Sequence, residues 1–164
     1  MRRTAFLAAA AAAAFAIPAA AASADSSKVE VHLFQTDVKF SAPTETTFQT
    51  SANASFGTRV RHGAPQGTVS LSCTQVSRDR AICNGTVTIY EPGAYLAWLR
   101  AGKPASGPGT VFESLVATNV AVRSTHDTLG AVPVSGGTGA WAGVKSGFVR
   151  GVNDSNQLIA VLFL

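Results

Sequence analysis

Residues 132–151 constrain the fold of this chain more than any other segment. A short apolar strand leads into a Gly-Gly-Thr-Gly run at residues 136–139, and a compact turn carrying Trp141 follows before a second strand begins. Glycine allows positive φ angles and close approach between backbones, and Thr138 can cap a single helical turn. Trp141 has a large apolar area, which favours burial. The segment therefore predicts two strands joined by a tightly packed turn, with Trp141 buried at one end of a barrel.

The first 24 residues have the layout of a secretory signal peptide. Arg2 and Arg3 precede an apolar run at residues 5–17, and residues 22–24 (Ala-Ser-Ala) fit the small-residue cleavage pattern. We expect cleavage after Ala24, one mature domain at residues 25–164, and a secreted, extracellular protein. The apolar run is too short for a membrane span, so we expect none after cleavage. The arginine pair leaves the twin-arginine route open beside the favoured general secretory route.

Charge and motifs argue against several classes of partner. Removing Arg2 and Arg3 from the 13 Lys and Arg residues leaves 11 against 9 Asp and Glu, and no basic stripe marks a nucleic-acid surface. The sequence has no phosphate-binding loop and no dinucleotide fingerprint, so we expect no cofactor. His32, His62 and His126 match no ligand spacing, so we expect surface histidines and no metal site.

Cys73 and Cys83 are predicted to form a disulfide, because an exported chain enters an oxidising compartment. The segments around them are typical of two strands joined by a polar turn at residues 77–80. Pairing these strands about Arg78 places the two cysteines opposite each other. We therefore expect a cross-strand disulfide.

Most of the mature chain alternates between apolar and polar residues with a period of two, which is typical of β-strands. The C-terminal segment at residues 158–164 is strongly apolar, and an unpaired apolar edge strand promotes aggregation. Pairing with the first strand, at residues 29–34, would cover it. We therefore predict an all-β protein, a single eight-stranded antiparallel β-barrel with one short apolar loop or helical turn. A β-sandwich carrier of the chromoprotein kind, with open edges, is the alternative.

The glycine-rich turn and its flanking strands resemble the signature of the allene oxide cyclase and dirigent barrel superfamily. The matching residues are Val134, Gly136, Gly137, Thr138, Gly139, Trp141, Ala142, Gly143 and Gly147. The superfamily pattern usually continues Gly-Ala-x-Gly, which residues 143–147 do not follow, so the chain resembles a divergent member. Residues 83–86 (Cys-Asn-Gly-Thr) are similar to its secreted bacterial members.

The resemblance implies an eight-stranded barrel, often oligomeric, whose interior handles small hydrophobic molecules. Its members cyclise an oxylipin epoxide, steer phenoxy radical coupling or catalyse pericyclic cyclisation in bacterial natural-product pathways. The resemblance assigns no catalytic residue in this chain.

Residues 111–124 form the longest predicted strand, and its two faces leave two interpretations open. Glu113, Asn119 and Arg123 share one face. If that face lines the barrel, burial would raise the pKa of the carboxyl and suit it to acid–base work or ligand binding. The opposite face alternates more cleanly, which favours placing it inside, with the charged set facing solvent or a partner subunit. Its members are Phe112, Val116, Val120 and Val122.

Tyr95 and Trp98 are further candidates for ligand contact, in a short apolar segment at residues 94–100. This segment would form either a lid over a cavity or a loop folded onto the barrel end.

Two functions remain open. The first is a secreted barrel that binds a small hydrophobic molecule, or steers its cyclisation or coupling, in an apolar cavity. The second is a non-catalytic extracellular structural or interaction barrel whose interior is filled by side chains. An eight-stranded barrel is wide enough for either. The superfamily also makes a homo-oligomer an expectation.

Overall fold

The computed structural model describes residues 27–56, 63–125, 128–152 and 156–164, and the structural statements below concern these residues. The predicted signal peptide, His62 and His126 lie outside them. Strands dominate, with one short helix, α1 (Ala94–Arg100), and one 3₁₀ turn, η1 (Gly139–Trp141). The strands are β1 (Lys28–Ser41), β2 (Thr47–Phe56), β3 (Gly67–Ser77), β4 (Arg80–Tyr90), β5 (Val111–Thr125), β6 (Thr128–Leu129), β7 (Val132–Pro133), β8 (Gly136–Thr138), β9 (Ser146–Gly151) and β10 (Gln157–Phe163). No helix in these ranges is long and apolar enough to cross a membrane.

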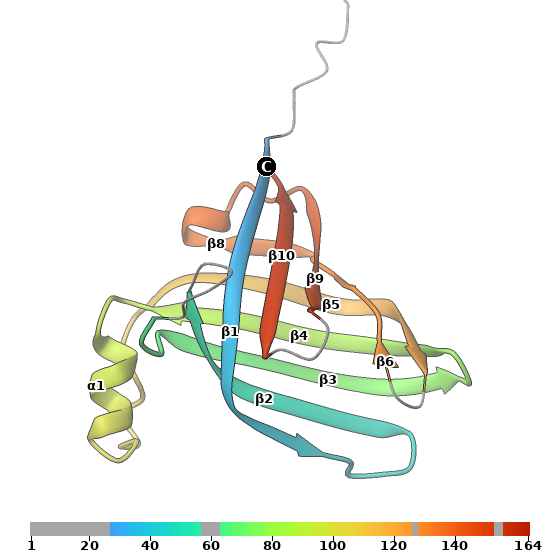
Figure 1. Ribbon diagram of the computed structural model, residues 1–164, viewed down its shortest axis with the longest axis horizontal. Helices are drawn as coiled ribbons and strands as arrows, with labels where there is room; N and C mark the ends of the chain where they lie inside the picture. Colours follow the sequence, from blue (N-terminus) through green and yellow to red (C-terminus); the bar gives the residue numbers. More distant parts are fainter. Residues whose placement is uncertain (1–26, 57–62, 126–127, 153–155) are drawn as a thin grey trace, which may run out of the picture.

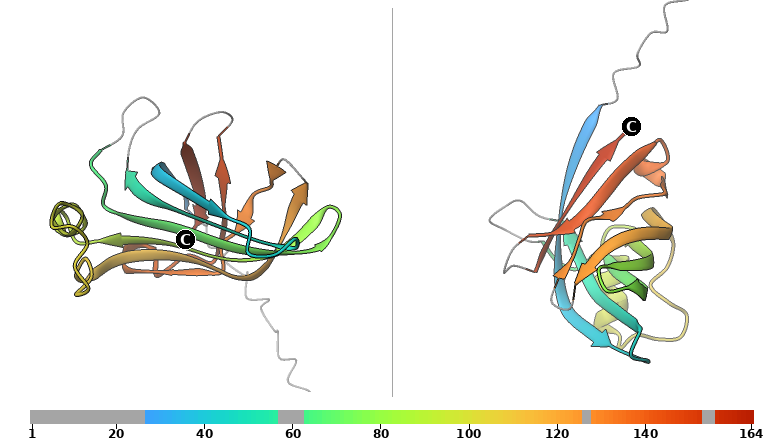
Figure 2. Two further views of the ribbon diagram at one scale, coloured as in Figure 1. Left: turned by 90° about the horizontal axis from the view of Figure 1, so that it is seen from below. Right: turned by 90° about the vertical axis from the view of Figure 1, so that its right-hand side faces the viewer.

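The strands form one antiparallel sheet in the order β6-β5-β4-β3-β2-β1-β10-β9-β7, with β8 paired to β5. The long strand β1 belongs to both halves of this sheet. Its first part pairs with β10, as predicted, and its second part pairs with β2. The register with β2 shifts between Thr36 and Lys39, where Asp37 adopts a φ of 52°. This irregularity lets the sheet curl, so that β1, β10 and β9 cross over β3, β4 and β5 (Figures 1 and 2).

The curled sheet is a half-barrel, which corrects the prediction of a closed eight-stranded barrel. Between β9 and β5 the chain contributes only short pairings: β7 pairs with β9, and β8 pairs with β5. Pro133 in β7 has no N–H to donate, and Gly136 and Gly137 in β8 have no side chains to pack. No full-length strand therefore fills this position.

The core lies on the inner face of the curl, where inward residues alternate with outward ones. Its members are Leu33, Ala54, Val69, Val87, Ile89, Leu115, Val134, Trp141, Ala160 and Leu162. Trp141 is 6% exposed, as the sequence predicts, and its ring meets that of Phe56 edge-on at 6.2 Å between centroids. The turn at residues 136–141 thus holds an aromatic side chain against the inner face.

Cys73 and Cys83 lie directly opposite each other in β3 and β4 and form the predicted disulfide, with Cα atoms 4.1 Å apart. A Cys73→Ala/Cys83→Ala variant is expected to lose about 2–3 kcal/mol of unfolding free energy, because the unfolded chain is no longer restricted by the short closed loop. Urea unfolding of both proteins measures this. Thiol titration of the unfolded, unreduced wild type is the control, and two free thiols would contradict the prediction.

Candidate functional site

A cavity of about 260 Å³ lies inside the curl of the sheet. Strands from both crossing layers contribute to its lining, so only the folded sheet brings these residues together. Most of the lining is aliphatic: Val69, Leu71, Val87, Leu115, Val116, Ala117, Leu129, Val132, Val134, Val149 and Leu158. Such a lining suits a small hydrophobic molecule.

The cavity also has a few polar groups and an opening. Gln35, Thr50, Ser70 and Thr86 line it, and none of the four makes a side-chain hydrogen bond to another described residue. Arg150 is the one charged residue in the lining as described. Arg150 and Gly151 are exposed, and Leu129 is 37% exposed, so the cavity reaches the surface beside β6 and β9. These side chains can orient a ligand by hydrogen bonds while the aliphatic wall holds it.

The structure separates the three predicted site residues of β5. The register between β4 and β5 shifts between Cys83 and Gly85, and Asn119 adopts a φ of 53° there. This β-bulge moves the inward positions from odd to even residue numbers. Glu113 is consequently buried before the bulge, whereas Asn119 and Arg123 are exposed.

The bulge also corrects the favoured choice of inner face. Phe112 is 54% exposed, so that choice is wrong at the start of β5. Val122, after the bulge, is buried as expected, and Val116 and Val120 are half-buried.

Glu113 is 6% exposed and lies under η1, where Gly139 packs against it. No hydrogen bond or ion pair reaches its carboxylate within the described chain. Burial therefore raises the pKa of Glu113 from its ordinary value of 4.5. The residue does not line the cavity, whose nearest member along the strand is Leu115. Whether Glu113 contacts a ligand stays a prediction.

The raised pKa of Glu113 predicts a pH-dependent stability. The folded chain holds the carboxyl proton more tightly than the unfolded chain, so the free energy of unfolding falls as pH rises from the unfolded pKa through the folded pKa. Glu113→Gln removes this decline, and we expect the variant to be more stable than the wild type at neutral pH and equal to it below about pH 4. Urea unfolding across this range tests it. The exposed Glu45→Gln is the control, and a pH-independent difference between Glu113→Gln and wild type would contradict the prediction.

Tyr95 and Trp98 lie on the other face of the sheet from the cavity. The Tyr95 hydroxyl donates to Asn53 Oδ1 at 2.7 Å, and Asn53 Nδ2 donates to Asp37 Oδ2 at 2.7 Å. Asn53 sits between two buried alanines of β2, one of them in the inner core, so it faces outward. Tyr95 also stacks on Tyr90, with centroids 5.5 Å apart.

These contacts fasten α1 to the outer face at one end of the sheet (Figure 1). Burial, with the nearby Tyr90 and Asp37, raises the pKa of Tyr95. Neither Tyr95 nor Trp98 lines the cavity, so the segment is not a lid over it. A role for these two residues in binding a ligand elsewhere stays a prediction.

The polar residues of the cavity were not among the predicted site residues. Gln35 follows Val29, Val31 and Leu33 with the period of two, so alternation could have placed it on the inner face. Arg150 has no such signal, because it joins the lining only through the pairing of β9 with β7 and β10.

Comparison with protein-family models, with curated proteins and with solved structures finds no match to this chain. Within the described ranges, no group of three or more His, Cys, Asp or Glu residues is arranged to hold a metal ion.

Proposed function

We propose that this chain is a secreted protein that binds a small hydrophobic molecule in the cavity inside its curled sheet. The aliphatic cavity of about 260 Å³ carries the proposal. It is larger than cavities of about 150 Å³ that hold benzene, and slightly smaller than the clefts of about 300–1,000 Å³ that hold drug-sized ligands. We therefore expect a compact ligand of one or two rings or a short hydrocarbon chain.

Secretion is supported by two observations. Residues 1–24 have the layout of a signal peptide, and the Cys73–Cys83 disulfide suits an oxidising compartment.

The turn at residues 136–141 resembles the allene oxide cyclase and dirigent superfamily, which handles such molecules inside a barrel. Cyclisation or coupling would here rely on the cavity's shape, on exclusion of water, and on polar groups of the lining such as Gln35, Thr50 and Arg150. The structural or interaction barrel is the second candidate. Side chains do not fill the cavity, which favours the binding protein over the structural barrel.

Titration with the fluorescent apolar probe N-phenyl-1-naphthylamine tests the proposal. We expect saturable binding to the wild type and markedly weaker binding to Val149→Phe, which places a ring in the cavity. Val76→Phe is the matched control, because Val76 is 58% exposed and lies outside the lining. Urea unfolding confirms that both variants fold. Absence of saturable binding, or equal binding by Val149→Phe, would favour the structural barrel.

A further inference from the structure

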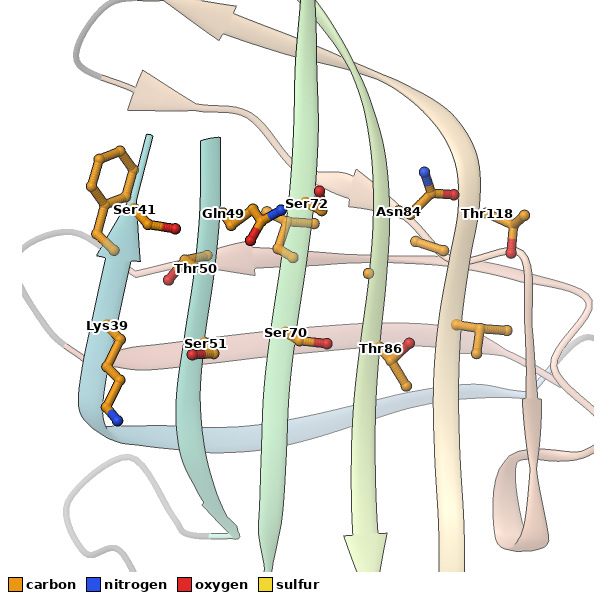
Figure 3. A pocket seen from close by; sticks show the side chains of 15 residues that line it. Lys39, Ser41, Gln49, Thr50, Ser51, Ser70, Ser72, Asn84, Thr86 and Thr118 are labelled. Carbon is orange, nitrogen blue, oxygen red and sulfur yellow. The ribbon is translucent and has the colours of Figure 1, made fainter. Parts of the chain in front are cut away.

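A second hollow, which we call the outer groove, lies on the face of the sheet opposite the core. Its volume is about 800 Å³, and it extends across β1, β2, β3, β4 and β5 (Figure 3). In β3 the groove residues Ser70 and Ser72 alternate with Val69 and Cys73, which belong to the inner face. The groove and the cavity lie on opposite faces of the same strands and share seven lining residues: Thr50, Ser70, Leu71, Gly85, Thr86, Val116 and Ala117. Ser51 and Ser72 belong to the groove alone.

Cross-strand pairing arranges the side chains of the outer groove in two rows. One row consists of Ser41, Gln49, Ser72 and Asn84. The other consists of Lys39, Ser51, Ser70 and Thr86. Figure 3 shows these side chains along neighbouring strands. Neighbours within a row are about 4.8 Å apart and the rows about 6.7 Å apart, as strand geometry requires.

The rows consist mostly of small, neutral side chains that both donate and accept hydrogen bonds. Lys39 is the one charged residue among those described as lining the outer groove. The hydroxyls of Ser51, Ser70 and Ser72 bond to no described residue. Asn84 accepts a hydrogen bond from the backbone N–H of Asn119 at 2.9 Å and keeps its amide donors available. The groove is therefore hollow because serines leave space there, and its polar groups are available to a ligand.

This chemistry argues against three classes of ligand. An apolar ligand would displace the water that hydrogen-bonds to the hydroxyls and would offer no hydrogen bonds in its place. A metal ion would need carboxylates, and the lining has none. A nucleic acid would need several cations, and the lining has one. A neutral or weakly acidic molecule with many hydroxyls can exchange hydrogen bonds with the hydroxyl and amide side chains of the groove.

We propose that the outer groove binds a carbohydrate chain. The serine, threonine and amide side chains of the two rows exchange hydrogen bonds with sugar hydroxyls. Lys39 donates to a hydroxyl or to the carboxylate of an acidic sugar. Ser70 and Thr86 also line the cavity, but the proposal requires no ligand there.

Calorimetric titration with cellohexaose, chitohexaose and hexagalacturonate tests this proposal. We expect one of the three to bind the wild type, and Ser51→Ile or Ser72→Ile to raise its Kd about tenfold or more, because each replaces hydrogen-bonding groups and fills the groove. Amide NMR shifts on titration should be concentrated at the two rows. Ser51 and Ser72 line the groove but not the cavity, so binding of N-phenyl-1-naphthylamine should not change in these variants.

Ser146→Ile is the matched control, because Ser146 is exposed in β9 and lies outside both linings. It should bind like the wild type. Binding of none of the three oligosaccharides, or equal binding by all variants, would overturn the proposal. A concentration-dependent dimer that Ser72→Ile disrupts, with no oligosaccharide bound, would assign this face to a second copy of the chain instead.

Discussion

Trp141→Ala is expected to lower the free energy of unfolding by about 3–5 kcal/mol, the range for removing a large buried aromatic side chain. Trp141 is 6% exposed, belongs to the inner core and meets the ring of Phe56 edge-on. The half-barrel has no full-length strand in this region, so little can move to fill the space left by the indole. Urea unfolding measures the loss. Phe112→Ala is the control, since Phe112 is 54% exposed and should lose much less. A loss below about 1 kcal/mol for Trp141→Ala would contradict the described turn.

Gly139→Ala is expected to cost roughly 2–5 kcal/mol, because backbone strain and overpacking act together. Gly139 has a φ of +63°, and a Cβ there would lie 2.3 Å from the carbonyl oxygen of Phe112 and 2.9 Å from Cβ of Glu113. Gly136→Ala is the matched control in the same run, because its Cβ would meet only Val116 Cγ2 at 3.8 Å, an ordinary contact. Urea unfolding of both variants tests the pair. Equal losses would show that the tight packing under η1 is not the cause.

The features that could be predicted from the sequence depend on neighbouring residues. Alternation identifies β3 and β4, and their short connection places Cys73 opposite Cys83. The glycine run and Trp141 together indicate a tight turn that buries an aromatic side chain. The pairing of β1 with β10 followed from the apolar C-terminal segment, which needs a partner on its edge.

Other features depend on single irregular residues or on strands far apart in the chain. The bulge at Asn119 inserts one residue and exchanges the faces of β5, and a period of two carries no sign of it. A period of two places Glu113 and Arg123 on the same face of β5. Because of the bulge, Glu113 is buried and Arg123 is exposed. The cavity and the outer groove each collect residues from several strands, so their composition follows only from the register of the whole sheet.

The pairing of β1 with β10 also determines when this fold can form. His32 and Gln157, whose side chains are 2.8 Å apart, are separated by 125 positions in the chain. Contacts of such separation slow folding, and we expect refolding in milliseconds to seconds. A chain emerging from the ribosome cannot pair this edge of β1 until β10 has been synthesised. Completion of the sheet therefore waits for β10, and one edge of β1 has no strand beside it until then.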